Sequence, residues 1–300
     1  MYENIEFVIC TAGECTRNYP HSRAIAHKSL LPMGDKRIID YVLQDILSIG
    51  GRHITFVCSN KTAVDAFKKA LSFDKKIVQK LRDKGHKEIA DIVDETILPA
   101  NIDLKFVIQK EPLGTGHVLY AARKAIKNRH VVLIFPDDII LSHNKKNPHM
   151  KRLLTAFLKN PKTALITAIW REDVSDNAIL LNNRIIEKPT HTLTHISGWD
   201  PNVLPKEMVQ FAIKRAPEKI KRVHETKKEW YYTDAINDFL DRGGEAAGFK
   251  VEMFLLSDKD QMVDTGRLLA YEQALLMMLL RHSKYQKQHQ QLAKKIIKIC

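Results

Sequence analysis

Short apolar runs alternate with stretches of helical periodicity through the first half of this chain, and this alternation limits the fold more than any other feature. The runs are rich in β-branched residues and predict strands at residues 6–11, 53–58, 104–109 and 130–135. Apolar residues at helical spacing predict helices at residues 38–49, 62–71, 75–97 and 118–127. Because parallel strands need crossover helices and are buried on both sides, we expect an α/β, Rossmann-like fold: a mostly parallel sheet with helices on both faces.

The second half has a more mixed pattern, which predicts strands at residues 164–170, 179–186 and 249–256 and helices at residues 206–214 and 233–241. A long C-terminal helix is predicted from about Thr265 almost to the end, and its apolar side suggests self-association into a homo-oligomer. The sequence has no internal repeat and no low-complexity linker. We therefore expect one continuous domain over residues 1–280, with residues 265–300 as a C-terminal helical tail.

The formal net charge of +13 points to an anionic partner. The basic residues are spread along the chain, with some enrichment only after Arg281, and there is no RNP-like aromatic signature or zinc-finger spacing. A diffuse positive charge suits small phosphorylated substrates equally well, so no nucleic-acid partner is expected. Nucleic-acid binding by the basic tail is kept as an alternative, beside a solvated or oligomer-forming helix.

Several protein classes are excluded by simple features. The four cysteines lack CxxC or His/Cys ligand spacing, so neither a disulfide framework nor a structural zinc site is expected. The first residues do not form the charged and apolar segments of a signal peptide, and no apolar stretch is long enough to cross a bilayer. We expect a soluble, cytoplasmic protein with no membrane partner.

The loop after the first predicted strand, Thr11 to Lys28, reads TAGECTRNYPHSRAIAHK. A loop that leaves a buried strand can direct several backbone N–H groups at one point, and Gly13 permits close approach by a phosphate. Arg17 and Lys28 add a forked and a compact positive charge, and transfer from a triphosphate depends mainly on positioning and charge neutralisation. Without further context, one glycine and scattered basic residues are also what a solvated turn contains.

Two acidic motifs are placed where a metal could bind. The Asp137-Asp138 pair closes the strand predicted at residues 130–135, and Asp264 directly precedes Thr265. Open α/β sheets bind ligands at the carboxyl ends of their strands, and Mg²⁺ is commonly held by one or two carboxylates plus substrate phosphates. The structural alternatives are a turn opened by the Asp pair and a helix N-cap at Asp264.

Two further motifs are suited to recognising a base and a sugar. The Gln109 amide can donate and accept at once, which suits the imide edge of uracil or thymine, and Gly114 would let backbone groups reach the base. Glu187 can accept hydrogen bonds from sugar hydroxyls, and Lys188 can neutralise a phosphate. Taken alone, a glycine turn and an exposed Glu-Lys pair are usually structural or solvated.

Together these segments resemble the signature of the sugar-phosphate nucleotidylyltransferases, GxGTRxxPxT…PKxxLP, which here reads Gly13-Glu14-Cys15-Thr16-Arg17, then Pro20, then Lys28-Ser29-Leu30-Leu31-Pro32. Within that family the chain is most similar to the branch of bacterial UTP–glucose-1-phosphate uridylyltransferases, over about residues 5–280. Cys15 stands where the family has a second glycine, His27 where it has a proline, and one extra residue lies between Arg17 and Lys28. Asn177-Ala178 stand where the family commonly has a glycine beside the sugar.

The resemblance implies roles for the matching positions. It assigns residues 1–145 approximately to a nucleotide-binding part and residues 146–264 to a mixed, sugar-phosphate-binding part. Catalytic roles are implied for Arg17 and Lys28, and Mg²⁺ would be the cofactor, held by Asp137 and Asp264. The implied nucleotide-binding residues are Ala12, Gly13, Thr16, Gln109 and Gly114, and the implied sugar-phosphate-binding residues are Glu187, Lys188 and Gly198.

The implied reaction transfers UMP from UTP to glucose 1-phosphate and gives UDP-glucose and pyrophosphate. Uridine and glucose come from the resemblance alone, so a thymidylyltransferase of the same family is kept as an alternative. A catalytically impaired homologue that binds or regulates through nucleotide sugars is a second alternative, based on Cys15 and His27.

Overall fold

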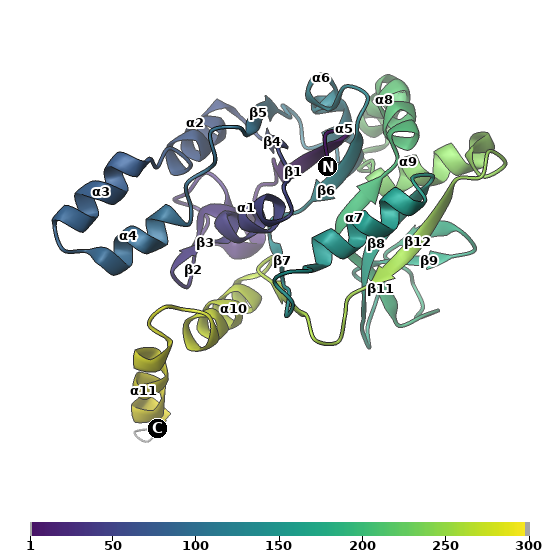
Figure 1. The fold of residues 1–300 in the computed structure, drawn as a ribbon. Helices are drawn as coiled ribbons and strands as arrows, with labels where there is room; N and C mark the ends of the chain where they lie inside the picture. The colour runs from purple at the N-terminus through teal and green to yellow at the C-terminus, as the bar shows by residue number, and fades with distance from the viewer. Residues whose placement is uncertain (1, 298–300) are drawn as a thin grey trace.

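The computed structural model describes residues 2–297 and contains a seven-stranded sheet in the order β12-β8-β11-β6-β1-β4-β5 (Figure 1). Neighbouring strands are parallel except at β11, which is antiparallel to both β6 and β8. The strands are β1 (Ile5–Thr11), β4 (His53–Cys58), β5 (Asp103–Ile108), β6 (His130–Ile134), β8 (Thr163–Trp170), β11 (Ile196–Leu204) and β12 (Lys250–Leu255). The expected mostly parallel α/β sheet is confirmed.

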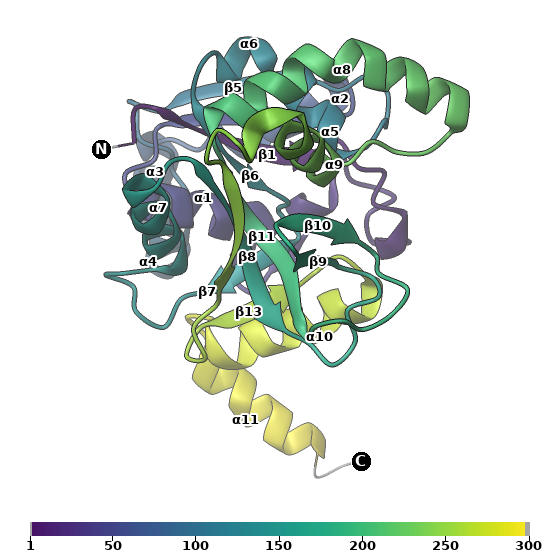
Figure 2. The same ribbon diagram turned by 90° about the vertical axis from the view of Figure 1, so that its right-hand side faces the viewer.

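Helices cover both faces of this sheet (Figure 2). One core contains side chains of α1 (Ile38–Ser48), α2 (Lys61–Ala70) and α7 (His149–Lys159). The other contains side chains of α5 (Thr115–Ala121), α6 (Arg123–Ile126), α8 (Lys206–Thr226) and α9 (Tyr232–Phe239). Successive residues of a strand point to opposite faces, so Phe7 and Ile9 enter the first core while Val8 enters the second.

The carboxyl ends of the parallel strands bring distant loops to one edge of the sheet. Because β1, β4, β5 and β6 run in one direction, the loops that follow β1, β5 and β6 leave from the same edge. These loops carry residues 12–28, Gln109 and Asp137, respectively. The fold therefore gathers three segments that are far apart in the sequence.

Three small antiparallel sheets complete the fold. In the first, β7 (Asp138–Leu141) pairs with β13 (Gln261–Asp264), which places Asp138 opposite Asp264. The second is the hairpin of β9 (Ala178–Leu181) and β10 (Arg184–Glu187). The third joins β2 (Pro32–Met33) to β3 (Lys36–Arg37), and a separate core links this region to α10 (Leu268–Arg281).

Several predicted elements are divided in the structure. The helix predicted at residues 75–97 is two helices, α3 (Lys75–Asp83) and α4 (Lys87–Asp94), because the chain turns at Gly85 with φ +80°. The strand predicted at residues 179–186 is the β9–β10 hairpin, whose turn residues Asn182 and Asn183 have φ values of 49° and 58°. The long C-terminal helix is also two helices, α10 and α11 (Gln286–Ile297).

Other helices differ in their boundaries. The helix predicted at residues 118–127 begins at Thr115 and is divided into α5 and α6 at Ala122, and that predicted at residues 206–214 continues to Thr226 through Pro217. The helix predicted at residues 233–241 ends at Phe239 and continues as η3 (Leu240–Gly244). Two short helical turns, η1 (Thr16–Asn18) and η2 (Lys28–Leu30), lie in the loop after β1.

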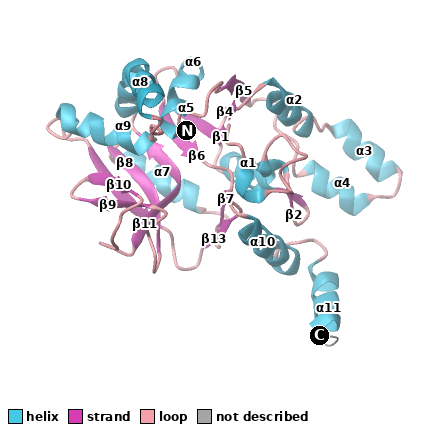
Figure 3. Cartoon of the chain, turned by 180° about the vertical axis from the view of Figure 1, so that it is seen from behind, coloured by secondary structure: helices cyan, strands magenta, loops and turns pink. Residues whose placement is uncertain are grey.

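The C-terminal helix α11 extends away from the sheet, as the view from behind shows (Figure 3). Leu276 on α10 and Leu292 on α11 are exposed, and homo-oligomer formation remains a prediction. Within residues 2–297, no helix combines the length and the hydrophobicity needed to span a membrane.

Candidate active site

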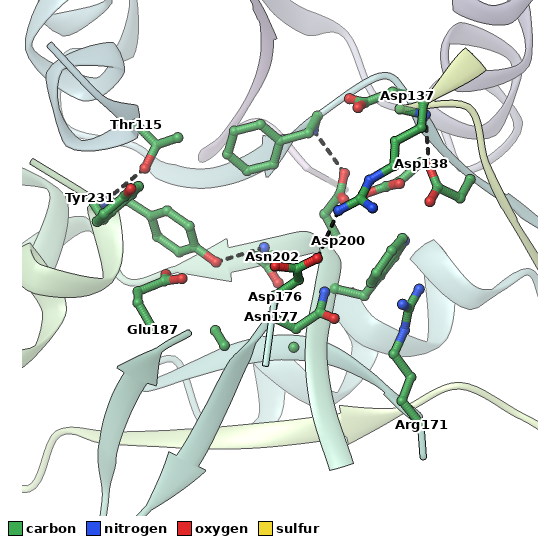
Figure 4. A pocket seen from close by; sticks show the side chains of 18 of the residues that line it. Thr115, Asp137, Asp138, Arg171, Asp176, Asn177, Glu187, Asp200, Asn202 and Tyr231 are labelled. Carbon is green, nitrogen blue, oxygen red and sulfur yellow. Dashed lines mark hydrogen bonds and ion pairs between the residues drawn. The ribbon is translucent and has the colours of Figure 1, made fainter. Parts of the chain in front are cut away.

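Two cavities meet at the carboxyl edge of the sheet. The loop cavity, about 400 Å³, lies beside the loop after β1, and its walls include Ala12, Gly13, His27, Lys28, Gln109 and Gly114. The β11 cavity, about 430 Å³, lies beside β11, and its walls include Arg171, Asn177, Glu187, Gly198, Trp199 and Asp200 (Figure 4). Both cavities are lined by Arg17, Thr115, Phe135, Asp137 and Asp138. Ligands in the two cavities would therefore meet at these shared residues.

The side chain of Cys15 is turned into the loop after β1. Cys15 has a left-handed backbone, with φ 58°, and immediately precedes η1. Its Sγ lies 3.4 Å from the Lys28 backbone nitrogen, from which it accepts, and 3.4 Å from the Gly13 oxygen, to which it donates. Cys15 lines neither cavity, and the same is true of Thr16, which was expected to bind nucleotide.

His27 fixes the start of the helical turn that carries Lys28. Its Nδ1 accepts a hydrogen bond from the Ser29 backbone N–H at 3.1 Å. Burial, and then the nearby Lys28 charge, lower the pKa of His27 from 6.5 to about 4, so the ring is neutral at physiological pH. Lys28 is itself buried, and its Nζ lies 2.5 Å from Oδ2 of Asp137.

Asp137 and Asp264 converge on the small space beside Gly266. A Cβ atom added to Gly266 would lie 3.0 Å from Oδ2 of Asp137 and 3.0 Å from Oδ1 of Asp264. The same Cβ would lie 3.9 Å from Nη2 of Arg17. The two predicted metal ligands and one predicted catalytic cation thus border a single space.

Hydrogen bonds hold this convergence in place. The backbone N–H and the hydroxyl of Thr265 both donate to the Asp137 carbonyl oxygen, each at 2.8 Å. The Asn18 amide donates to the Thr265 carbonyl oxygen at 2.9 Å, which ties η1 to the end of β13. The Gly266 N–H donates to Oδ1 of Asp264 at 2.6 Å. The loop after β1, the turn after β6 and the end of β13 therefore form one unit.

The carboxyl groups of the site differ in their charge. Burial alone would raise the pKa of Asp137, but the Lys28 ammonium outweighs it and the pKa lies below its ordinary value. Burial, then Asp200 and Asp137, raise the pKa of Asp138 well above its ordinary value. Burial also raises the pKa of Asp200 to about 7. Asp137 is therefore ionised, while Asp138 and Asp200 retain protons more readily.

Gln109 lies as expected in the loop cavity, but the glycines after it have an additional neighbour. The Gln109 side chain is buried and its Nε2 donates to the Gly114 carbonyl oxygen at 3.2 Å. Gly114 has φ +100°, and a Cβ there would lie 2.4 Å from the Trp230 carbonyl oxygen. A Cβ at Gly116 would lie 2.7 Å from the Trp230 ring. Both glycines thus make room for the segment that contains Trp230.

The residues predicted to bind the sugar phosphate are divided by the structure. Glu187 lines the β11 cavity, and its Oε1 accepts a hydrogen bond from the Thr233 hydroxyl at 2.6 Å. Burial raises the pKa of Glu187, although the hydrogen bond from Thr233 by itself would lower it. Gly198 also lines this cavity. The side chain of Lys188 is exposed and lines neither cavity, although its backbone N–H bonds to the Asn177 carbonyl oxygen at 3.0 Å.

Comparison with known proteins decides the family. The family model described as "Nucleotidyl transferase" matches residues 7–279. The chain belongs to this family.

Relatives of this nucleotidyl transferase include a protein named UTP–glucose-1-phosphate uridylyltransferase from Haemophilus ducreyi, which is 24% identical and covers 98% of this chain and 99% of its own. A protein of the same name from Streptococcus pyogenes is 25% identical and covers 88% of this chain and 80% of its own. Among solved structures, a UDP-glucose pyrophosphorylase from Acinetobacter baumannii has a TM-score of 0.78 at 21% identity and covers 99% of this chain and 100% of its own. A UTP-bound structure from the same organism has a TM-score of 0.77 at 22% identity, covering 98% of this chain and 99% of its own.

The donors beside Gly266 fit a divalent cation whose coordination is completed by other ligands. Within residues 2–297, no group of three or more His, Cys, Asp or Glu side chains is arranged to hold a metal ion. Two converging carboxylates are nevertheless what Mg²⁺ commonly uses when substrate phosphates and water supply its other oxygens. The Asp137 carboxylate is already in the ionised form that a cation requires.

Arg171 and Asp200 are among the residues of the β11 cavity that sequence reasoning missed. Asp200 lies at an irregularity of β11 between Gly198 and Asn202, and its Oδ2 accepts the Phe135 backbone N–H at 2.8 Å. The nearest sequence signal was Gly198, which the family resemblance placed among the sugar-phosphate-binding residues.

Proposed function

We propose that this nucleotidyl transferase moves UMP from UTP to a hexose 1-phosphate and releases pyrophosphate, with glucose 1-phosphate and UDP-glucose as the first substrate and product to test. The observation that carries the proposal is the junction of two cavities at Arg17, Asp137 and Asp138. A transferase of this kind must hold two phosphorylated substrates with their phosphates adjacent. The names of the relatives from Haemophilus ducreyi and Streptococcus pyogenes support uridine and glucose.

The loop cavity is assigned to the nucleotide. Ala12 and Gly13 would face the phosphates with their backbone, and a Cβ at Gly13 would meet nothing within 4 Å. The buried Gln109 would face the base through its amide, beside Gly114. Residues 1–145 would thus supply most of the nucleotide part.

The β11 cavity is assigned to the sugar phosphate, on residues 146–264 and the shared junction. Glu187 would accept hydrogen bonds from sugar hydroxyls while Thr233 holds its carboxylate in position. Gly198 would let the sugar approach the backbone of β11. Lys188 would need to rotate its exposed side chain to reach a phosphate, so its proposed role depends on a change at substrate binding.

The proposed reaction is a single in-line displacement. An oxygen of the sugar 1-phosphate attacks the α-phosphorus of UTP, the bond from that phosphorus to the bridging oxygen breaks, and pyrophosphate leaves with the electron pair. The attacking oxygen is already anionic, so no general base is needed. Lys28 would hold the α-phosphate, and Arg17 would stabilise the charge on the leaving pyrophosphate.

We assign Mg²⁺ to Asp137 and Asp264, where it would neutralise phosphate charge when bound. The Lys28 ammonium would then transfer part of its contact from Asp137 to the substrate phosphate. The raised pKa values of Asp138 and Asp200 would favour the neutral carboxyl form at these neighbours and so limit further negative charge beside the phosphates.

The test is pyrophosphate release with UTP, dTTP, CTP, ATP and GTP against a panel of sugar 1-phosphates, with and without Mg²⁺. The proposal predicts Mg²⁺-dependent release that is fastest with UTP and a hexose 1-phosphate. Faster release with dTTP would favour the thymidylyltransferase alternative. Binding of UTP by calorimetry without release from any pair would favour the impaired homologue. The inward-turned thiol of Cys15 argues for retained chemistry, because it leaves the loop cavity open.

A further inference from the structure

Arg171 is a positive charge in the β11 cavity that the proposed reaction does not use. It follows β8 and lines the cavity with its guanidinium. In the described part of the chain its Nε is buried without a hydrogen-bond partner, and its guanidinium makes no ion pair within 4.0 Å. The Arg171 side chain is half-buried and no carboxylate within residues 2–297 neutralises it, so its charge is available to an anionic ligand in the cavity.

The Arg171 side chain is held firmly rather than extended into solvent. Its Cζ atom lies 4.3 Å from the centroid of the Trp199 ring, over which the guanidinium stacks. Its backbone N–H donates to the His195 carbonyl oxygen at 2.8 Å, and the His195 ring bonds back to the Arg171 carbonyl oxygen at 3.0 Å. These hydrogen bonds fix the backbone of Arg171, and the Trp199 stack holds its guanidinium, which therefore loses little further freedom when it binds a ligand.

One carboxylate on the wall of the β11 cavity is already engaged by another arginine. Asp176 accepts a hydrogen bond from Nη2 of Arg267 at 2.7 Å, so it does not compensate the charge of Arg171. Asp173, which also senses the Arg171 charge, is exposed and accepts a hydrogen bond from the Ser175 N–H at 2.9 Å. The positive charge of Arg171 therefore remains directed at the cavity.

Arg171 also lies away from the place where the phosphates would react. Figure 4 shows Asp137 and Asp138 at the upper right of the cavity, whereas Arg171 rises from the lower right and Glu187 from the lower left. A sugar with its 1-phosphate beside Asp137 and its hydroxyls toward Glu187 would turn another substituent toward Arg171.

We propose that Arg171, stacked on Trp199, is a second anion-binding position of the sugar cavity, which selects an acceptor with a carboxylate or a phosphate distant from its 1-phosphate. The inference rests on the proposed assignment of the β11 cavity to the sugar. Glucuronic acid 1-phosphate and glucose 1,6-bisphosphate carry the two forms of this second anionic group. A bidentate Arg–carboxylate or Arg–phosphate contact suits either.

The test is equilibrium binding measured by calorimetry, which does not depend on turnover. Wild-type protein with Mg²⁺ is titrated with glucose 1-phosphate, glucuronic acid 1-phosphate and glucose 1,6-bisphosphate. We expect at least one doubly anionic sugar to bind about tenfold or more tightly than glucose 1-phosphate, the size expected of a charge-assisted contact. Preference for the uronate or for the bisphosphate identifies the anion.

Variants separate a specific contact from general attraction to a basic protein. Arg171→Gln should reduce the preference to less than about threefold, and Arg171→Lys should retain part of it because the charge remains but the planar fork is lost. Arg242→Gln is the matched control, because Arg242 pairs with Asp238 outside both cavities. It should keep the wild-type preference.

Equal or weaker binding of both doubly anionic sugars to the wild type overturns the inference, as does a preference that survives in Arg171→Gln. Thermal unfolding of each variant checks that the fold is retained, and Arg171→Lys supplies the comparison should Arg171→Gln be unstable. Pyrophosphate release is measured separately with the same sugars. Its absence with every sugar would count against the proposed transfer, whereas the binding preference alone decides the role of Arg171.

Discussion

Gly266 offers a direct perturbation of the proposed metal site, because a single methyl group there meets both carboxylates. The Cβ of Gly266→Ala would lie 3.0 Å from Oδ2 of Asp137 and 3.0 Å from Oδ1 of Asp264. Ordinary contact requires about 3.4 Å, so each carboxylate must move by a few tenths of an ångström. A misplacement of about 1 Å at a reaction centre costs about a hundredfold in rate. Shifts of this smaller size at both carboxylates should lower kcat by about tenfold.

The backbone at Gly266 does not have a positive φ, so alanine introduces no conformational strain. The Gly266→Ala protein should unfold within about 2 °C of the wild type. The assay is pyrophosphate release at saturating UTP and hexose 1-phosphate over a range of Mg²⁺ concentrations, with half-maximal activity at a higher Mg²⁺ concentration in the variant. Gly13→Ala is a folding control, since its Cβ meets nothing within 4 Å. Unchanged kcat and Mg²⁺ dependence in Gly266→Ala would refute the placement of the metal between these carboxylates.

Three further perturbations follow from individual contacts. Gly114→Ala should lower the free energy of unfolding by about 2 kcal/mol or more in denaturant titrations. The cause is that alanine is strained at φ +100° and that its Cβ would lie 2.4 Å from the Trp230 carbonyl oxygen. A loss below about 0.5 kcal/mol would argue against this contact. Burial is the main cause that raises the pKa of Asp200 from 3.8 to about 7. Between these two pH values the folded protein holds a proton that the unfolded chain has released, so the free energy of unfolding should fall as pH rises from about 4 to 7. Asp200→Asn should remove up to about 4 kcal/mol of that fall, measured as unfolding free energy against pH, and an identical pH profile would contradict the shift. Thr233→Val removes the hydroxyl that donates to Glu187. It should raise KM for the sugar phosphate by roughly fivefold to tenfold while KM for UTP stays constant. Equal changes in both constants would place Thr233 outside sugar recognition.

Elements with strong local patterns could be predicted from the sequence. The strand at His53–Cys58 was predicted to the residue, because its apolar run is bounded by polar and glycine residues. By contrast, β11 was not predicted, since it contains Gly198, Asp200 and Pro201, which are poor strand formers. Its place between β6 and β8 depends on pairing with strands more than 25 residues away, information that a local pattern lacks.

The same distinction applies to the site. Arg17, Lys28, Asp137 and Gln109 stand in local motifs beside strand ends, so they could be selected before the structure was known, and the structure places all of them on the cavities. Trp230 could not be selected, because its contact with Gly114 joins segments more than 100 residues apart. Lys188 differs, because its motif predicted a place in the site but the structure leaves it outside. Its backbone has a positive φ of 48°, and its exposed side chain lines neither cavity.

The central claim is that the two cavities hold two substrates whose phosphates meet at Asp137. The most direct measurement follows the label from [α-³²P]UTP during incubation with Mg²⁺ and a hexose 1-phosphate, in the wild type and in Asp137→Ala. The wild type should place the label in a nucleotide sugar with one pyrophosphate released per product, and Asp137→Ala should form no product. Because that variant leaves the buried Lys28 without its partner, circular dichroism checks that it is folded under the assay conditions. Label that remains in UTP or appears only as UMP in the wild type, or near-normal product in Asp137→Ala, would contradict the claim.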